Sequence, residues 1–444
     1  MIKISAEWTT VIMLTGILLG VLTGVPIAFP IGALALLMGF LLFGMPVFDL
    51  LYSRLFEITT SYVLVAIPLF VFMGIMLEKS GIADAMFDAL YLWLGGLKGG
   101  LAIATVLIGT VVAATVGIIG ASVTMMALTA LPAMIKRGYD KALAAGTVCA
   151  SGCLGILIPP SVMLVIYGPM ALISVGKLFM GAFIPGFLLA ALYLLYIALR
   201  CQLQPELGPV VPAEERAVPL MKKTVLLIKS LIPPSLLVLS VLGVIFLGIA
   251  PPTEAAAIGS LAATLLVIAY RKFNFGVLRS VSLDTLRVTS MILIIGGCSY
   301  AFVGVFIGAG CGKVVEEVII ATPGGAWGAF AIVQFIIFIL GFFMDWLGIV
   351  FIMVPIVTPV AETLGFDALW FAMMICLNFQ TSFMTPPFAT AIFYVRGSAA
   401  PELGLTMADI IRGVIPFVVI ILVGLALCVA FPQLITWLPS IMIK

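Results

Sequence analysis

Two proline doublets lie inside long apolar stretches where a helix would otherwise continue. Pro159-Pro160 follows a glycine-rich run that includes Gly155, and Pro386-Pro387 follows a run of hydroxyl and amide side chains. Proline removes a backbone donor and its ring clashes with the preceding turn, so each doublet should interrupt its helix. Carbonyl oxygens freed in this way can replace the hydration shell of a hard cation such as Na⁺. The alternative is a simple packing kink.

The run before the second doublet is unusually polar for an apolar stretch. Five polar side chains occur within residues 378–385, where unpaired polar groups are costly. They predict a site for a cation or a polar solute, whereas the alternative is hydrogen bonding between neighbouring helices. Arg396, beyond this run, either attracts an anionic substrate or anchors the helix end. The residues that we assign to substrate contact are Ser151, Ser161, Asn378, Gln380, Thr381 and Arg396.

Asp345 stands in the middle of an apolar stretch, and a comparable break occurs at 117–122. An acid at membrane depth is a candidate cation ligand or proton acceptor. The alternative for Asp345 is an N-cap of the helix that follows it. The tip around this break, 115–122, offers hydroxyls and bare backbone, and a helix that begins there would present its positive end to an anion.

The composition restricts the classes of protein to which the chain can belong. Of 444 residues, 64% are apolar and 9% are charged, which is typical of a chain that crosses a membrane repeatedly. The absence of histidine excludes a His relay, a His-ligated metal and a Ser-His triad. The scattered cysteines and the lack of a phosphate-binding loop argue against a metal centre and against ATP-driven pumping. We therefore expect no enzyme, no organic cofactor, no transition metal and no nucleic-acid partner; the lipid bilayer is the partner that the composition requires.

Apolar runs predict ten membrane crossings and two re-entrant helical hairpins. The hairpins are expected at 100–135 and 326–363, because each stretch is interrupted midway by small or polar residues. Three amphipathic segments, 46–60, 82–96 and 274–288, are expected to lie along the membrane surface. The predicted crossings are 9–25, 27–44, 62–78, 143–168, 178–199, 225–249, 253–270, 290–308, 369–395 and 409–430.

The distribution of positive charge orients these crossings. With a periplasmic N-terminus, the basic residues outside the cytoplasm are Lys3, Arg54, Lys177, Lys313 and Lys444, which leaves sixteen of the 21 inside. The positive-inside rule therefore favours this orientation. The polar segment 201–223 is then a cytoplasmic linker.

A shift of 227 residues superposes the two halves of the chain. It aligns Pro132 with Pro359, Asp140 with Asp367, and the first proline doublet with the second. Chance is the alternative, because two further proline doublets occur elsewhere in the chain. An odd number of crossings per half makes 224–444 inverted relative to 1–200, the architecture of many secondary carriers. The fold prediction is an all-α polytopic membrane protein with inverted repeats.

Several runs together resemble the large membrane (M) subunit, DctM, of TRAP (tripartite ATP-independent periplasmic) transporters. They are Gly117-Ile-Ile-Gly-Ala-Ser-Val123, Lys136-Arg-Gly-Tyr-Asp140, Gly155-Ile-Leu-Ile-Pro-Pro-Ser161, Gly341-Phe-Phe-Met-Asp345 and Asn378-Phe-Gln-Thr-Ser-Phe-Met-Thr-Pro-Pro387. The resemblance implies an elevator-type carrier in a bacterial inner membrane that takes up organic acids with Na⁺. It also implies two partners, a small four-helix Q subunit and a periplasmic substrate-binding protein. The alternative is a stand-alone cation-coupled dicarboxylate or anion symporter without partner subunits.

The same resemblance implies two sodium sites, each between a hairpin tip and a proline break. Val116 and Ile118 occupy positions that often hold hydroxyls in the family, so backbone ligands are expected at the first tip. The first site would use Gly117, Gly120, Ser122, Gly155, Ile158 and Pro160, and the second Asp345, Ser382, Thr385 and Pro387.

Overall fold

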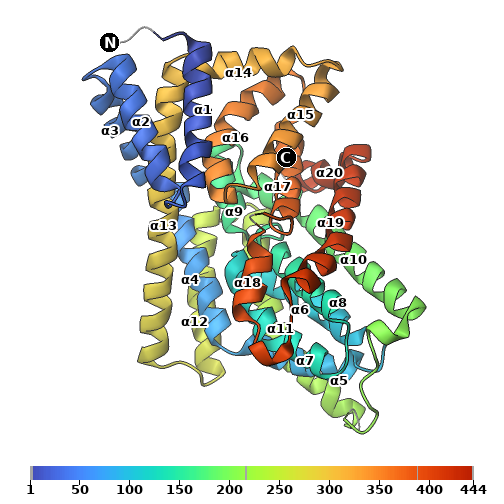
Figure 1. Cartoon of the computed structure of the whole chain (residues 1–444). Coiled ribbons are helices and arrows are strands. Elements are labelled where there is room, and N and C mark those ends of the chain that lie inside the picture. The colour runs from blue at the N-terminus through green and yellow to red at the C-terminus, as the bar shows by residue number, and fades with distance from the viewer. Residues whose placement is uncertain (1–3, 216–217, 388, 443–444) are drawn as a thin grey trace.

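The computed structural model describes residues 4–215, 218–387 and 389–442 (Figure 1), and within these ranges it is helical with no strand. Eight helices are long and apolar enough to cross a membrane, and several shorter apolar helices accompany them. The structure therefore confirms the predicted all-α, polytopic class. Lys3, Arg216 and Lys444, which enter the charge count above, lie outside the described residues.

The helices of the first part of the chain follow the predicted order, and the chain breaks where interruptions were expected. They are α1 (Ala6–Leu22), α2 (Ala28–Phe43), α3 (Val47–Thr60), the 3₁₀ turn η1 (Tyr62–Val65), α4 (Ala66–Lys79), α5 (Ile82–Leu94), α6 (Gly100–Val116), α7 (Ile119–Lys136), α8 (Lys141–Cys153), η2 (Leu154–Ile156), α9 (Val162–Ala171) and α10 (Val175–Leu203).

The second part runs through a similar series of elements. They are η3 (Pro205–Leu207), α11 (Leu220–Phe246), α12 (Pro252–Ala269), α13 (Phe275–Gly308), α14 (Cys311–Ile320), α15 (Gly325–Leu340), α16 (Trp346–Thr363), α17 (Ala368–Ser382), α18 (Thr390–Ser398), η4 (Pro401–Leu403), α19 (Met407–Ala430) and α20 (Gln433–Met442).

Both stretches that were predicted as hairpins fold as two helices joined by a short turn. In the first, α6 and α7 pack against each other and Gly117 forms the turn with φ +64°. Glycine adopts this left-handed conformation without the steric cost that a Cβ brings. In the second, α15 and α16 also pack together, and Asp345 directly precedes α16.

Each proline doublet interrupts its helix, as predicted. The doublet Pro159-Pro160 separates α8 from α9, Pro386-Pro387 separates α17 from α18, and both are joined by cis peptide bonds. The two interrupted helices also begin alike. Asp140 accepts a hydrogen bond from the amide of Leu143 at 2.8 Å, and Asp367 accepts one from Trp370 at 2.7 Å. These aspartates are N-caps, which satisfy amides that have no partner inside the helix.

The helices form two groups that lie side by side (Figure 1). A scaffold group, on the left of the view, contains α1–α4, α12 and α13, which pack on one another. A hairpin group contains α6–α10 and α15–α19. Helices α8 and α17 form the interior of the hairpin group, since almost all of their side chains are buried. The two groups are joined where α13 packs on α16 and where α4 packs on α6 and α9.

The prediction of a separate surface segment at 274–288 is wrong. These residues continue without interruption into the predicted crossing 290–308, forming the 34-residue helix α13. At about 1.5 Å per residue this helix is roughly 50 Å long, which exceeds the hydrocarbon thickness of about 30 Å. No proline lies inside α13, so nothing local stops the helix. The other two amphipathic segments form the separate helices α3 and α5.

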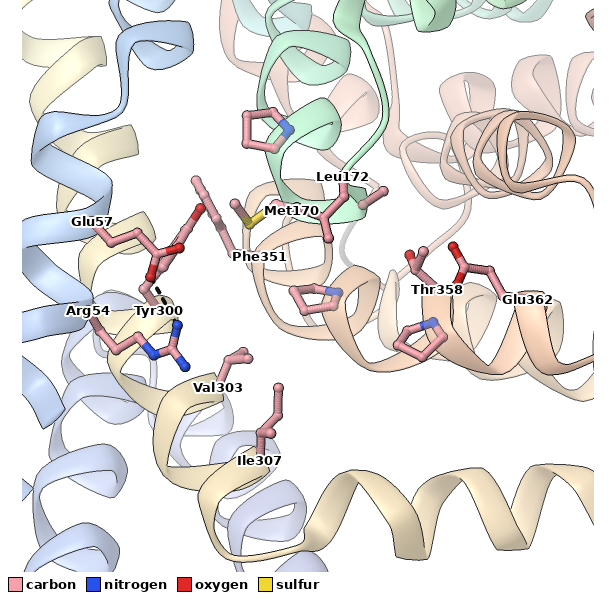
Figure 2. A pocket seen from close by; sticks show the side chains of 14 residues that line it. Arg54, Glu57, Met170, Leu172, Tyr300, Val303, Ile307, Phe351, Thr358 and Glu362 are labelled. Carbon is pink, nitrogen blue, oxygen red and sulfur yellow. Dashed lines mark hydrogen bonds and ion pairs between the residues drawn. The ribbon is translucent and has the colours of Figure 1, made fainter.

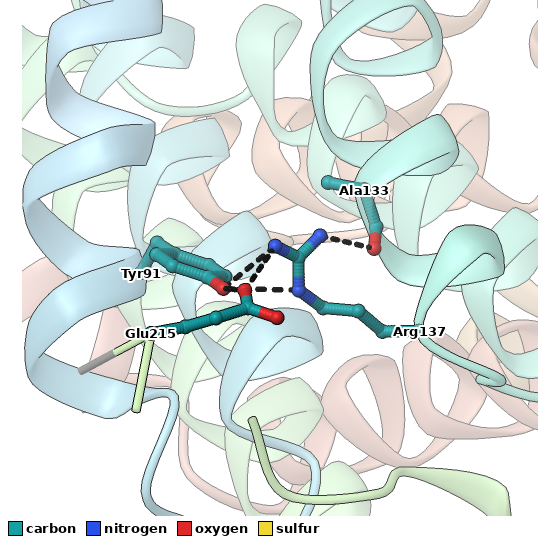
Figure 3. A network of polar contacts seen from close by, with 4 residues as sticks. All are labelled: Tyr91, Ala133, Arg137 and Glu215. Carbon is teal, nitrogen blue, oxygen red and sulfur yellow. Dashed lines mark hydrogen bonds and ion pairs between the residues drawn. The ribbon is translucent and has the colours of Figure 1, made fainter. Parts of the chain in front are cut away.

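The polar linker is bonded to the segment that precedes α6, the first helix of the first pair. The amide of Gly99 donates to the carbonyl of Gly208, and the amide of Val211 donates to that of Gly95, both at 2.8 Å. Figure 3 shows a third contact, in which Arg137 binds the Glu215 carboxylate with Nη2 at 2.7 Å and also donates to the hydroxyl of Tyr91. Hydrogen bonds from Tyr91 and Arg137 lower the pKa of Glu215.

Candidate functional site

The turn of the first helix pair lies directly against the first proline break. A methyl group at Gly117 would lie 3.4 Å from the carbonyl oxygen of Pro160 and from the amide of Val162. A methyl group at Gly155 would lie 3.2 Å from the hydroxyl oxygen of Ser122. Hairpin turn and helix break are thus in contact. Four of the residues that were predicted for the first sodium site come together there, Gly117, Ser122, Gly155 and Pro160.

The two serine hydroxyls in this region differ, because Ser161 has a hydrogen-bond partner and Ser122 has none among the described residues. Ser122 is fully buried, and its hydroxyl finds no hydrogen-bond partner within the described part of the chain. Such an atom needs a ligand or a water, because an unpaired buried hydroxyl costs free energy. Ser161, by contrast, donates to the carbonyl of Ile156 inside the break. The side chain of Ile158 packs against Gly186 of α10.

The second helix pair, α15 and α16, also contacts the helix that the second break interrupts, but here that helix provides the hydroxyl. A methyl group at Gly341, after α15, would lie only 2.1 Å from the hydroxyl oxygen of Ser382. Ser382 is buried, and its hydroxyl has no partner among the residues that the structure describes. Thr385 donates to the carbonyl of Thr381 at 2.7 Å, and Pro387 is exposed.

A small cavity of about 80 Å³ lies where the two turns approach each other and the scaffold group. The first turn contributes Gly120, the second contributes Asp345, and α18 contributes Thr390 and Tyr394. The wall from the scaffold group belongs to α13. We call this space the tip cavity; its remaining lining residues are Ile118, Ile119, Val162, Val288, Met291, Ile292, Trp346 and Leu347.

The tip cavity depends on a close approach between Gly120 and Tyr394. A methyl group at Gly120 would lie 2.9 Å from the ring carbon Cζ and 3.0 Å from the hydroxyl oxygen of Tyr394. Thr390 adds a buried hydroxyl oxygen without a partner within the described ranges. We had not predicted Tyr394 or Thr390 as site residues. The 227-residue register, which aligns Tyr394 with Tyr167, was the available signal for the tyrosine.

Asp345 borders the tip cavity and occupies the N-cap position of α16. Unlike Asp140 and Asp367, it makes no capping hydrogen bond of ordinary geometry to the described backbone. Its side chain is partly buried. Asp345 therefore stands at the cap position without forming the cap bond, and the cavity leaves its carboxylate beside space for a ligand.

The residues that were predicted to contact substrate do not line the tip cavity. Asn378 donates to the carbonyl oxygen and to Oε1 of Gln334, at 2.7 and 2.8 Å, and thereby ties α17 to α15. Thr381 donates to the carbonyl of Asn378 at 2.6 Å. The contacts of Asn378 fit the interhelical alternative, whereas Thr381 bonds within its own helix α17.

The other four predicted contacts do not line the cavity either, and one of them, Ser161, donates within the first break. Ser151 donates to the carbonyl of Val148 at 3.2 Å, and Arg396 donates to the carbonyl of Leu405. Gln380 is fully buried, and neither of its side-chain polar atoms has a partner in the described ranges.

A larger cavity of about 260 Å³ lies between α3, α13, α16 and the end of α9 (Figure 2). Its Arg54 is already paired with Glu57 at 2.9 Å, and Glu362 and Thr358 face the space from α16. None of the predicted site residues lines it. We therefore take the tip cavity, where turns, breaks and scaffold meet, as the candidate site.

Comparison with known proteins shows the family of the chain. The family model described as "Tripartite ATP-independent periplasmic transporter, DctM component" matches residues 14–434. The C4-dicarboxylate TRAP transporter large permease protein DctM of Pseudomonas aeruginosa is 31% identical, over 87% of this chain and 88% of that protein. The ectoine TRAP transporter large permease protein TeaC of Halomonas elongata is 25% identical, over 96% and 97%.

Among solved structures, the Alcanivorax borkumensis YdaH transporter has a similar fold. The TM-score is 0.62, over 96% of this chain and 99% of that chain, and at 16% identity the likeness concerns the fold alone. The match of the family model over nearly the whole sequence is the stronger finding. The chain therefore belongs to the DctM family of tripartite ATP-independent periplasmic transporters, and is a transporter subunit rather than an enzyme.

Proposed function

We propose that this chain carries an organic acid across the bacterial inner membrane in symport with Na⁺. The observation that carries the proposal is the tip cavity, in which both hairpin turns meet the scaffold helix α13. A periplasmic binding protein delivers the acid, and a small four-helix subunit completes the complex. The family description as tripartite supports these partners over the stand-alone symporter.

The two contacts between turn and break are the proposed sodium sites. In the first, the Ser122 hydroxyl lies against Gly155, and Gly117 of the same turn lies against the backbone carbonyl of Pro160. In the second, the Ser382 hydroxyl lies against Gly341, and Asp345 belongs to the same hairpin turn as Gly341. Both hydroxyls are buried and unpartnered in the described structure, and a cation would satisfy them.

The substrate is proposed to bind in the tip cavity. Helices α7 and α16 both begin there, at Ile119 and Trp346, and each is 18 residues long. Their N-termini carry partial positive charge, which favours an anion. The named relatives carry different solutes, so family membership leaves the acid open.

We further propose that the hairpin group moves as an elevator against the scaffold group, with an inverted repeat on each side of the linker and a periplasmic N-terminus. The turn between α6 and α7 is buried against the first proline break, since Gly117 lies against Pro160 and Val162. Non-helical backbone at membrane depth is tolerated where protein covers it, and this supports hairpins that enter and return.

Uptake into proteoliposomes tests the proposal. The chain, reconstituted with its small membrane subunit and its binding protein, should accumulate the acid that the binding protein holds only under an inward Na⁺ gradient. Equal uptake in Na⁺-free medium with a proton gradient would remove the coupling claim. Equal uptake without the binding protein would favour the stand-alone symporter.

A further inference from the structure

We infer that the tip cavity takes a compact monoanionic acid in preference to a dicarboxylate. This inference rests on the proposed function, since it concerns the ligand of the same cavity. The argument comes from the charge of the residues around the space, from the chemistry of its walls, and from its size.

The charge around the tip cavity favours a single negative charge on the ligand. Of the described residues that line it, Asp345 alone is charged, and none is a lysine or arginine. Two basic residues lie nearby in the sequence. Arg287 is paired with Asp284 at 3.2 Å, and Arg396 donates to the carbonyl of Leu405. A second carboxylate would therefore be buried without a cation to pair with it, which is strongly unfavourable.

The groups that can receive an anion are sufficient for one carboxylate. The N-termini of α7 and α16 supply about half a positive charge each. The hydroxyls of Thr390 and Tyr394 add two donors that border the same space. The Asp345 carboxylate offsets part of this positive potential unless a cation is bound beside it, and it would repel a second carboxylate on the ligand.

The opposite wall suits a hydrocarbon group. Helix α13 contributes Val288, Met291 and Ile292, and the start of α16 contributes Trp346 and Leu347. A methyl or ethyl group can pack on these side chains, whereas a carboxylate there would lose its hydration without gaining a hydrogen bond. At about 80 Å³ the cavity also favours a small ligand.

Matched pairs of acids test the inference in the purified full-length chain in Na⁺ buffer. Butanoate is compared with succinate, and 2-hydroxybutanoate with malate, so that each pair exchanges a terminal methyl for a carboxylate. Trp346 borders the cavity, so binding is followed by tryptophan fluorescence, with Trp346→Phe as the control for signal origin. We expect the monoanion of each pair to half-saturate the signal at a concentration at least roughly tenfold lower, the factor that about 1.4 kcal/mol of charge mismatch gives.

A substitution in the apolar wall gives a second test. Met291→Lys would place a cation opposite the helix N-termini, and Met291→Gln is the uncharged control. We expect the lysine variant to bind succinate about tenfold more tightly than the wild type, and the glutamine variant, which adds a hydrogen-bond donor but no charge, to gain clearly less. Equal gains in both variants would contradict the charge argument.

The outcomes separate this inference from the proposed function. If succinate and malate bind as tightly as the monoanions, or more tightly, the inference is overturned while Na⁺-coupled transport stands. If none of the four acids changes the Trp346-dependent signal, the tip cavity is not the acid site, and both the inference and the proposed substrate position fail.

Discussion

The two contacts between hairpin turn and helix break are built alike but carry their hydroxyl on opposite partners. In the first, Ser122 belongs to the hairpin and faces Gly155 at the break. In the second, Ser382 belongs to the interrupted helix and faces Gly341 on the hairpin. Gly155 and Ser382 are equivalent in the 227-residue register. Each contact thus places one buried serine hydroxyl against one glycine. The serine comes from the hairpin in the first contact and from the interrupted helix in the second.

The helices behind the two contacts are held together in different ways. In the second half, Asn378 and Gln334 form hydrogen bonds between α17 and α15. In the first half, the equivalent position to Asn378 is Ser151, which bonds only to its own helix and packs against Gly109, where a methyl group would lie 2.5 Å from its Cβ. Small residues permit close packing, and amides give hydrogen bonds across the interface. The first half is therefore joined by packing and the second by polar contacts.

The largest effect is expected from filling the space that glycine leaves at the second contact. Gly341→Ala would place a methyl group 2.1 Å from the Ser382 hydroxyl, so one helix must move. We expect a loss of about 1–3 kcal/mol of stability, with uptake nearly abolished. Gly155→Ala, at 3.2 Å from Ser122, should cost less.

Thermal unfolding in detergent and uptake by proteoliposomes measure this difference. Gly243→Ala is the matched control, because no atom lies near the added methyl group in the described structure and alanine favours a helix. Equal stability of the Gly341 and Gly243 variants would contradict the close contact.

The two hydroxyls should respond alike if both contacts bind Na⁺. Ser122→Ala and Ser382→Ala each remove an oxygen that has no protein partner in the described ranges, so stability without Na⁺ should change little. The concentration of Na⁺ that gives half-maximal uptake should rise about tenfold for each. Unfolding in Na⁺-free buffer and uptake at varied Na⁺ concentration measure the two quantities. An unchanged Na⁺ dependence in one variant would assign sodium binding to the other contact alone.

The polar contacts between α15 and α17 should contribute to stability rather than to recognition. Asn378→Leu removes the hydrogen bonds to Gln334, and we expect a loss of roughly 0.6–2 kcal/mol of stability. Ser151→Ala, its equivalent in the first half, should have a smaller effect, since it loses one bond within its own helix. The Km for the acid should be unchanged in both. A raised Km for Asn378→Leu at normal stability would restore this residue to the substrate site.

The linker contact with the first half should give the smallest effect and depend on pH. The pKa of Glu215 is lowered by hydrogen bonds from Tyr91 and Arg137, so its contribution is present above the ordinary Glu pKa of about 4.3 and is lost as the pH falls through the lowered value. A spin label on Ala213→Cys should become more mobile in acid. Glu215→Gln should give the mobile spectrum already at neutral pH; an immobile label would show that the backbone bonds alone hold the linker.

Much of the fold follows from local signals in the sequence. Apolar runs, proline doublets and the aspartates Asp140 and Asp367 act on the neighbouring backbone, so helices, breaks and caps could be predicted without knowing what packs beside them. The resemblance to the DctM family also implied that each hairpin turn lies beside its break, and the structure brings Gly117 to Pro160 and Gly341 to Ser382.

Only the tertiary structure decided which way the polar side chains face and what surrounds the cavity. The sequence marked 378–385 as polar, but Asn378 faces α15 because the packing of the two helices sets the rotation of α17 about its axis. Likewise, Tyr394 and the α13 residues reach the tip cavity from segments about a hundred residues apart, and no local pattern encodes that meeting. Sequence alone thus determined where the chain breaks, whereas long-range packing determined which groups those breaks expose to a ligand.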